Sequence, residues 1–181
     1  DRTARYRLEL IEKNARRLLQ FVDQLMDLSK LEAGQMPLEI RPDAPLESLR
    51  MIVESFQPLA IKNQIKLHVI HPDKSHIVLF DRGKFEQVVS NLLSNALKFT
   101  GSNGTVTVEL EMSLEDRIQL NVTDTGIGIP ENALALVFDR FYQTGAFSSQ
   151  GTGIGLALTK ELVERMSGSI SVKSQPEIGT T

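Results

Sequence analysis

Several residue types that carry particular chemistry are absent or rare in this sequence. It has no cysteine, which excludes disulfides, thiolate zinc sites and a cysteine nucleophile. It has no tryptophan and only 6% aromatic residues, so there is no obvious platform for stacking nucleic-acid bases. Lysine and arginine number 20 against 23 acidic residues, a net charge of -3. This balance argues against a nucleic-acid partner, which would require a basic surface.

Long hydrophobic runs are missing as well. The longest uninterrupted apolar run, 133–138, has six residues, whereas a helix that spans a bilayer needs about 20. With 41% hydrophobic and 24% charged residues, the composition is typical of a soluble globular domain. It excludes wholesale disorder.

Residues 4–31 are predicted to form one long helix. Gly34 and Pro37 follow it, as is common after a helix end. Its apolar residues recur at alternating steps of four and three, which is a heptad seam: Ala4, Leu8, Ile11, Ala15, Leu18, Val22 and Leu25. A helix with one apolar stripe needs partner helices, so we assign residues 1–34 to a helical bundle. The alternative is a helix folded onto its own domain.

The rest of the chain, 35–181, is predicted to be an α+β domain. Helices are expected at 45–62, 81–99, 133–138 and 153–166, with Asp43 and Asp81 as N-caps. Alternating or buried apolar runs predict strands at 36–40, 65–69, 77–80, 106–110, 118–122 and 170–172, and a last strand near the end of the sequence. These elements predict a two-layer α/β sandwich, a mixed sheet packed on helices, preceded by the long bundle helix.

The expected helix 81–99 carries a polar face. Asn91, Asn95 and Lys98 lie at positions i, i+4 and i+7, so they share one side of the helix. Asparagine is a poor residue for the middle of a helix. Amide oxygens can bind Mg²⁺ or its water ligands, and an ammonium offsets phosphate charge. An ordinary solvated face is the alternative.

Glycine is concentrated in one part of the chain. Of the 12 glycines, six lie between Gly126 and Gly155. Glycine weakens a packed core, so this cluster favours turns or a close approach of backbone to a ligand.

Two glycine-rich segments stand out within that cluster. The run 124–130 places Asp124 at a strand end, where its carboxylate could accept a hydrogen bond from an exocyclic amine such as that of adenine. A simple glycine turn is the alternative. The run 151–156 opens a helix, whose backbone N–H groups could bind an anion. Because that run follows a long loop rather than the first strand of a βαβ unit, we reject a dinucleotide-binding interpretation.

Together these segments resemble the ATP-binding catalytic domain of sensor histidine kinases, which has a Bergerat-type fold. The superfamily also contains DNA gyrase, mismatch-repair and heat-shock chaperone ATPases. The matching segments, in chain order, are the asparagine box 91–100, the first glycine box 124–130, the phenylalanine box 138–142, the second glycine box 151–156 and the start of a glycine–threonine box, 177–181. The resemblance covers about 36–181. The stretch 28–34 resembles the end of the second helix of the family's dimerisation and histidine-phosphotransfer bundle.

The resemblance implies ATP and Mg²⁺ as cofactors. It implies Asn95 and Asn91 as metal ligands. It implies Asn91, Lys98 and Arg140 as the catalytic residues, with Arg140 carried towards the phosphates by a mobile lid.

The resemblance also implies a set of nucleotide contacts. Asp124 is expected to bind the adenine amine, with Thr180 nearby, and Asn95 contacts the nucleotide through its metal. The remaining expected contacts are Phe99, Gly126, Gly128, Ile129, Gly151, Gly153, Ile154, Gly155 and Leu156. Beyond the site, the family implies a homodimer formed through the bundle, a response-regulator receiver domain as partner, and a cytoplasmic kinase core whose parent protein a membrane segment could anchor.

One feature of the family is missing from this sequence. The phosphoacceptor histidine of the family lies on the first bundle helix and is followed by an acidic residue. The histidines here, His68, His71 and His76, lie in the α+β part, and none precedes an acidic residue. We therefore expect a chain that binds nucleotide without carrying its own phosphoacceptor.

Two other functions are compatible with a nucleotide site. The first is an ATP-hydrolysing switch of the same superfamily, which places a glutamate four residues before the metal asparagine. Here that position is Asn91, an amide that cannot take a proton from water, so a kinase is favoured. The second is a scaffold that binds nucleotide only to set dimer geometry, and the intact Asn95, Asp124 and glycine boxes argue against it.

Overall fold

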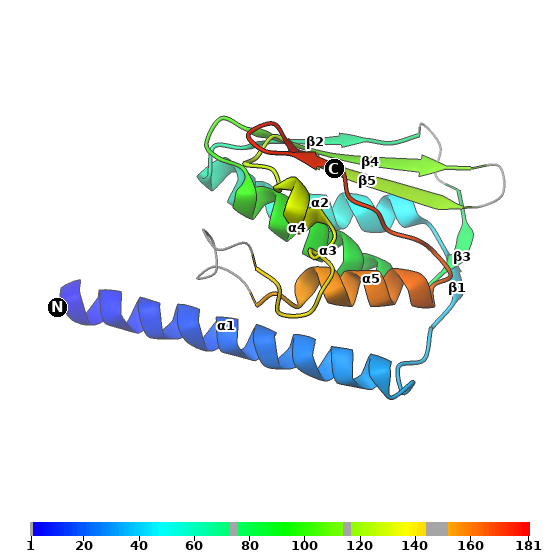
Figure 1. Ribbon diagram of the computed structural model, residues 1–181, viewed down its shortest axis with the longest axis horizontal. Coiled ribbons are helices and arrows are strands. Elements are labelled where there is room, and N and C mark those ends of the chain that lie inside the picture. Colours follow the sequence, from blue (N-terminus) through cyan, green and yellow to red (C-terminus); the bar gives the residue numbers. More distant parts are fainter. Residues whose placement is uncertain (1, 73–75, 114–116, 144–151) are drawn as a thin grey trace.

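A long helix runs beside an α+β domain in the computed structural model, which describes residues 2–72, 76–113, 117–143 and 152–181 (Figure 1). The helices are α1 (Arg2–Glu32), α2 (Pro45–Lys62), α3 (Arg82–Phe99), α4 (Glu131–Leu134) and α5 (Gly155–Arg165). The strands are β1 (Arg41–Asp43), β2 (Lys66–Ile70), β3 (Val78–Phe80), β4 (Thr105–Met112), β5 (Ile118–Asp124), β6 (Ser174–Gln175) and β7 (Gly179–Thr180).

The main sheet is mixed, as predicted. Its strand order is β2-β4-β5-β7-β6. Strands β2 and β4 are parallel, and the other neighbours are antiparallel. Strands β1 and β3 form a separate antiparallel ribbon. The predicted fold class, an α+β sandwich with a mixed sheet packed on helices, is confirmed.

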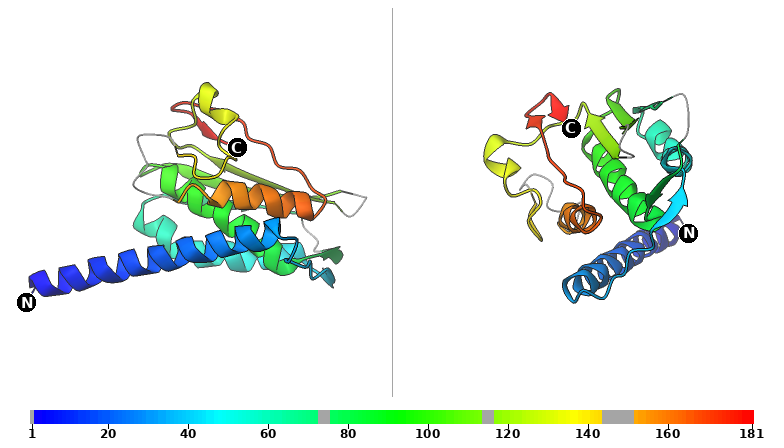
Figure 2. Two further views of the ribbon diagram at one scale, coloured as in Figure 1. Left: turned by 60° about the horizontal axis from the view of Figure 1, so that its bottom comes forward. Right: turned by 90° about the vertical axis from the view of Figure 1, so that its right-hand side faces the viewer.

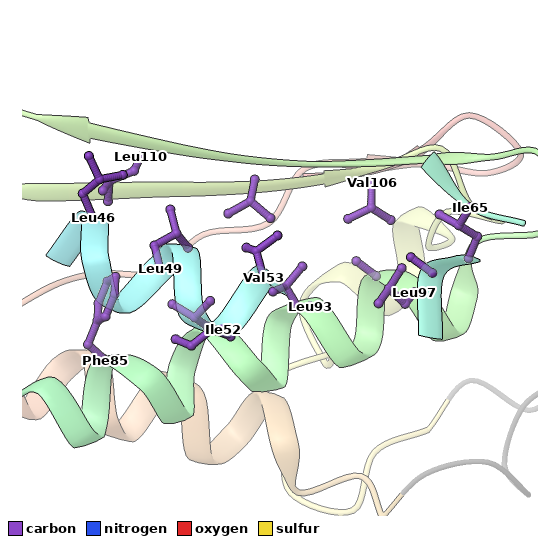
Figure 3. Packing of buried hydrophobic residues seen from close by; sticks show 14 of the residues in the cluster. Leu46, Leu49, Ile52, Val53, Ile65, Phe85, Leu93, Leu97, Val106 and Leu110 are labelled. Atoms are coloured by element: carbon purple, nitrogen blue, oxygen red, sulfur yellow. The ribbon is translucent and has the colours of Figure 1, made fainter. Parts of the chain in front are cut away.

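Helices α2 and α3 pack on one face of this sheet and enclose what we call the sheet core (Figure 3). Leucine and valine side chains of both helices meet the inward-facing residues of β4, since alternate residues of a strand point to the same face. Leu49, Leu93 and Val106 are completely buried there. Helix α3 begins where predicted, because the carboxylate of Asp81 accepts a hydrogen bond from the backbone N–H of Lys84 at 3.0 Å.

A second cluster, the rod cluster, joins α1 to the domain. The last turns of α1 contribute Leu28 and Leu31, which pack with Val88 of α3 and with α5. The rest of the cluster is Met36, Ile154, Leu158 and Leu162. The N-terminal part of α1 projects beyond the domain (Figure 2), and its predicted seam is exposed there, with Leu8, Ile11 and Leu18 each about two-thirds accessible.

The structure differs from the sequence-based expectation at a few local points. Residues 36–40 are not a strand, and the strand of that region is β1 at Arg41–Asp43. Residues 170–172 are not a strand either. The strand of that region, β6, begins at Ser174, which pairs with Thr180.

Two side chains also lie elsewhere than expected. Asp43 does not cap α2: Ala44 is the N-cap residue, and Asp43 accepts a hydrogen bond from the adjacent N–H of Ala44 at 2.8 Å. The helical spacing of Phe85, Val89, Leu92 and Ala96 predicts that all four pack on the sheet. Leu92 instead packs against the rod cluster, because it lies on the edge of α3 that faces α5. None of the helices in the described part of the chain is long and apolar enough to cross a membrane.

Candidate functional site

A cavity of about 580 Å³ lies between α3, the end of β5, the N-terminus of α5 and residues 170–172. Most of the predicted site residues line it, although they come from segments far apart in the sequence. They are Asn91, Asn95, Lys98, Phe99, Asp124, Gly128, Ile129, Gly153, Gly155, Leu156 and Thr180. The fold therefore brings residues of all five predicted boxes to one place.

The polar face of α3 forms one wall of the cavity. Asn91 donates through Nδ2 to the carbonyl oxygen of Gly155 and to the hydroxyl of Thr159, both at 3.4 Å. Its carbonyl oxygen is therefore the atom left for another ligand. The ammonium of Lys98 lies 4.3 Å from the ring centre of Phe99, a cation–π contact at the cavity wall.

Asp124 ends strand β5, where its backbone pairs with that of Thr180. Its carboxylate accepts a hydrogen bond from the backbone N–H of Gly126 at 2.8 Å. Burial raises the pKa of Asp124 above its usual value, and the backbone N–H groups of Gly126 and Thr180 partly offset this by stabilising the charged form. A half-buried acceptor held in this way can bind an amine donor such as that of adenine.

The two glycines of the first glycine box have different roles. Gly128 lines the cavity and has φ +66°, in the left-handed region that favours glycine. Gly126 does not line the cavity. It packs against the backbone of Phe99, which a Cβ at this position would overlap. Gly126 thus allows close packing of the segment after β5 on α3, and its expected nucleotide contact stays a prediction.

The second glycine box surrounds the start of α5. Gly153 has φ +71° and lies against the backbone of Phe141, which donates its N–H to the carbonyl of Gly153 at 2.8 Å. Gly155 and Leu156 line the cavity. Ile154 does not: its side chain is fully buried in the rod cluster, because successive residues at a helix start point in different directions. Gly151 lies outside the described residues.

Arg140 is not at the cavity. It is exposed and forms an ion pair with Glu161 of α5, with 3.6 Å between nitrogen and oxygen. Its neighbours Phe138, Tyr142 and Gln143 do line the cavity. The predicted movement of Arg140 towards phosphates therefore stays a prediction.

The polar side chains of the cavity fit Mg²⁺, which binds phosphates and water as well as protein, better than a metal ion bound by protein side chains alone. In the part of the chain that the structure describes, no group of three or more His, Cys, Asp or Glu side chains could hold a metal. Mg²⁺ usually keeps several waters and takes substrate phosphates with only one or two protein ligands. The amide oxygens of Asn95 and Asn91 suit that role.

Sequence reasoning missed the contribution of two segments to the cavity. Residues 170–172 line it as extended chain, and Gln24 lines it from α1. No local signal marks Gln24, since it becomes part of the site only through the packing of α1 on α5.

Comparison with known proteins identifies the family. Residues 80–181 match the family described as histidine kinase-, DNA gyrase B-, and HSP90-like ATPase. The chain belongs to this family. It is 37% identical over 167 residues to the sensor histidine kinase RcsC of Escherichia coli K12, an alignment that covers 90% of this chain and 17% of RcsC. It is 36% identical to the kinase BarA of the same organism, over 99% of this chain and 20% of BarA.

Solved structures agree with these relatives. Full-length ShkA in complex with AMPPNP matches with a TM-score of 0.84 and 27% identity, over 97% of this chain and 37% of ShkA. The catalytic domain of the histidine kinase ThkA matches with a TM-score of 0.69 and 26% identity, over 79% of this chain and 91% of that domain. The ATPase domain is thus of the sensor histidine kinase type, as the boxes predicted. The chain spans about a fifth of the length of the curated relatives, or less.

Proposed function

We propose that this chain is the ATP-binding catalytic core of a sensor histidine kinase, together with one helix of its phosphotransfer bundle. The whole protein would transfer the γ-phosphoryl group of ATP to a bundle histidine, for relay to a response-regulator aspartate. This proposal rests on the observation that Asp124, the amide face of α3 and the start of α5 line the same cavity. In support, the related structure of ShkA was solved with AMPPNP.

The geometry suggests a role for each wall. Asp124, paired with Thr180 at the sheet end of the cavity, would accept the adenine amine. Asn95 and Asn91 would hold Mg²⁺, which would neutralise phosphate charge when bound. Lys98 would face the phosphates as a point charge.

The same geometry favours phosphoryl transfer to a protein over ATP hydrolysis. Asn91 stands where the hydrolysing members of the superfamily have a glutamate, and its amide nitrogen is engaged by Gly155 and Thr159. An amide in this position cannot activate water as a general base. Its amide oxygen would instead help to hold the metal and phosphates.

The remaining proposals concern the parent protein. Residues 1–34 would be the second helix of a dimeric bundle and 35–181 the catalytic domain, with a cytoplasmic location and a receiver domain as partner. A solved neighbour with the same fold is a complex of the histidine kinase ThkA with the response regulator TrrA. His68 is exposed on β2, and His71 lies 3.1 Å from Arg50, so neither is placed on a bundle helix.

A labelling experiment tests the proposed reaction. Incubated with γ-labelled ATP, this chain alone should acquire no acid-labile label. Addition of a separate bundle that contains the first helix and its histidine should give label on that bundle. Labelling of His68, His71 or His76 would show that the acceptor has been misplaced, and release of free phosphate at a rate that exceeds labelling would favour the hydrolysing alternative.

A further inference from the structure

Helix α1 contributes one side chain to the nucleotide cavity. Gln24 is half-buried and lines the cavity. Its Oε1 accepts a hydrogen bond from the hydroxyl of Thr152 at 2.8 Å. One wall of the cavity therefore belongs to a helix that the sequence assigns to a separate bundle.

The Gln24 amide turns its oxygen towards Thr152, whose hydroxyl donates to it. The hydroxyl oxygen of Thr152 also accepts the backbone N–H of Ile154 at 3.3 Å. Among the described residues, its amino group Nε2 has no hydrogen-bond partner. Two N–H donors are therefore left at the cavity wall.

These donors lie at the end of the cavity that suits phosphate. Thr152 immediately precedes Gly153, and α5, a helix of 11 residues, begins at Gly155. Backbone N–H groups at the start of a helix favour anions. Asn91 reaches the same place from α3, through its contact with Gly155. The adenine side, with Asp124 and Thr180, lies on the sheet instead.

We propose that Gln24, supplied by the bundle helix, is a ligand of the terminal phosphate of ATP. This proposal rests on the proposed ATP binding. Its amino group donates a hydrogen bond to that phosphate, while its oxygen keeps the contact with Thr152. ADP lacks the terminal phosphate. The affinity for ATP, but not that for ADP, therefore depends on Gln24.

This contact links nucleotide binding to the position of α1. The rod cluster holds the end of α1 against α5, and Gln87 of α3 donates to the carboxylate of Asp27 at 2.8 Å. Coupling between two binding events is reciprocal. ATP therefore stabilises the docked position of α1 more than ADP does, and a movement of α1 away from α5 weakens ATP binding.

Calorimetry of the 181-residue chain with Mg·ATP and Mg·ADP tests the proposal. Gln24→Glu keeps an oxygen for Thr152 but replaces the amino group by a second oxygen. It should weaken ATP binding by at least about 10-fold, the effect of losing a hydrogen bond to a charged group, and change ADP binding by less than about 2-fold. Gln24→Ala should show the same selectivity for ATP. Gln35→Glu, which adds the same charge at an exposed residue outside the cavity, should leave both affinities unchanged.

Hydrogen exchange supplies a second measurement. In the wild type, ATP should protect the amides of residues 20–31 more than ADP does, and in Gln24→Glu the two nucleotides should protect them equally. An unchanged ratio of ATP to ADP affinity in Gln24→Glu, or equal weakening of both, would overturn the assignment. A wild-type chain that binds neither nucleotide is a different result, and it would overturn the proposed function itself.

Discussion

The sheet core and the rod cluster support different parts of the same cavity. The sheet core closes on itself between α2, α3 and the sheet. The rod cluster is built from the end of α1 and from α5, with Val88 of α3. Its helix α1 continues into an exposed apolar seam. Asp124 lies on the sheet side of the cavity, and Gly155 on the α5 side.

The difference between the sheet core and the rod cluster shows which apolar surfaces this chain buries by itself. The sheet core contains completely buried residues from helices and strands alike, such as Leu93 and Val108. Along α1, by contrast, apolar burial is confined to the last turns. The Asp124 side of the cavity therefore rests on a finished core, whereas the Gly155 side rests on a cluster that depends on where α1 lies.

The largest expected effect comes from breaking the sheet core. Leu93 of α3 is completely buried, and Leu93→Ala would leave a cavity between α3 and the sheet. We expect a loss of about 2–5 kcal/mol in the free energy of unfolding, measured by denaturant titration. Leu59→Ala provides a matched control, because Leu59 is 42% exposed on α2 and should cost far less. Equal losses for the two variants would contradict the placement of Leu93.

The next largest effect concerns the adenine side. Asp124→Ala removes a half-buried carboxylate at the end of β5, outside the sheet core, so the fold should persist while Mg·ATP binding weakens. Loss of a hydrogen bond to a charged group costs about 1.5–3 kcal/mol, roughly 10- to 150-fold in affinity. Calorimetry that finds unchanged affinity would remove adenine recognition from Asp124.

Asp124→Asn separates this binding role from stability. Because burial raises the pKa of Asp124 in the folded protein, the folded chain holds the proton more tightly than the unfolded chain. Its contribution to stability is therefore present in acid and is lost as the pH rises through the folded pKa. At neutral pH the asparagine variant, which can still accept the N–H of Gly126, should be at least as stable as the wild type. A large loss of stability would show a structural role instead.

Local sequence signals predicted the sheet side of the site well and the α5 side less well. The capping of α3 by Asp81 follows from an aspartate directly before a helical run. The polar face with Asn91 and Asn95 follows from helix periodicity. Both signals depend on near neighbours alone. The burial of Ile154 in the rod cluster was not predicted, because a glycine-rich run does not show which of its side chains turns inwards. Gln24 could not be predicted at all, because it reaches the cavity only when α1 packs against α5.

The smallest expected effect is self-association through the exposed seam of α1. The seam residues Leu8, Ile11 and Leu18 are about two-thirds exposed, and full burial of a leucine is worth about 1.5–3 kcal/mol. Large exposed apolar patches favour association, and a four-helix bundle formed from two subunits would cover this seam. Because the proposed bundle would take a single helix, α1, from this chain, we expect weak, concentration-dependent association.

Sedimentation velocity of the wild type against the double variant Leu18→Glu, Val22→Glu measures this association. Both residues lie on the seam and outside the rod cluster, so the charges should abolish association without undocking the end of α1. Retained protection of residues 28–31 in hydrogen exchange would confirm that docking survives. If the wild type and the variant are both monomers at high micromolar concentration, the seam does not drive dimerisation. The N-terminal part of α1 would then have to be covered within the same chain, and its assignment to a separate bundle would be wrong.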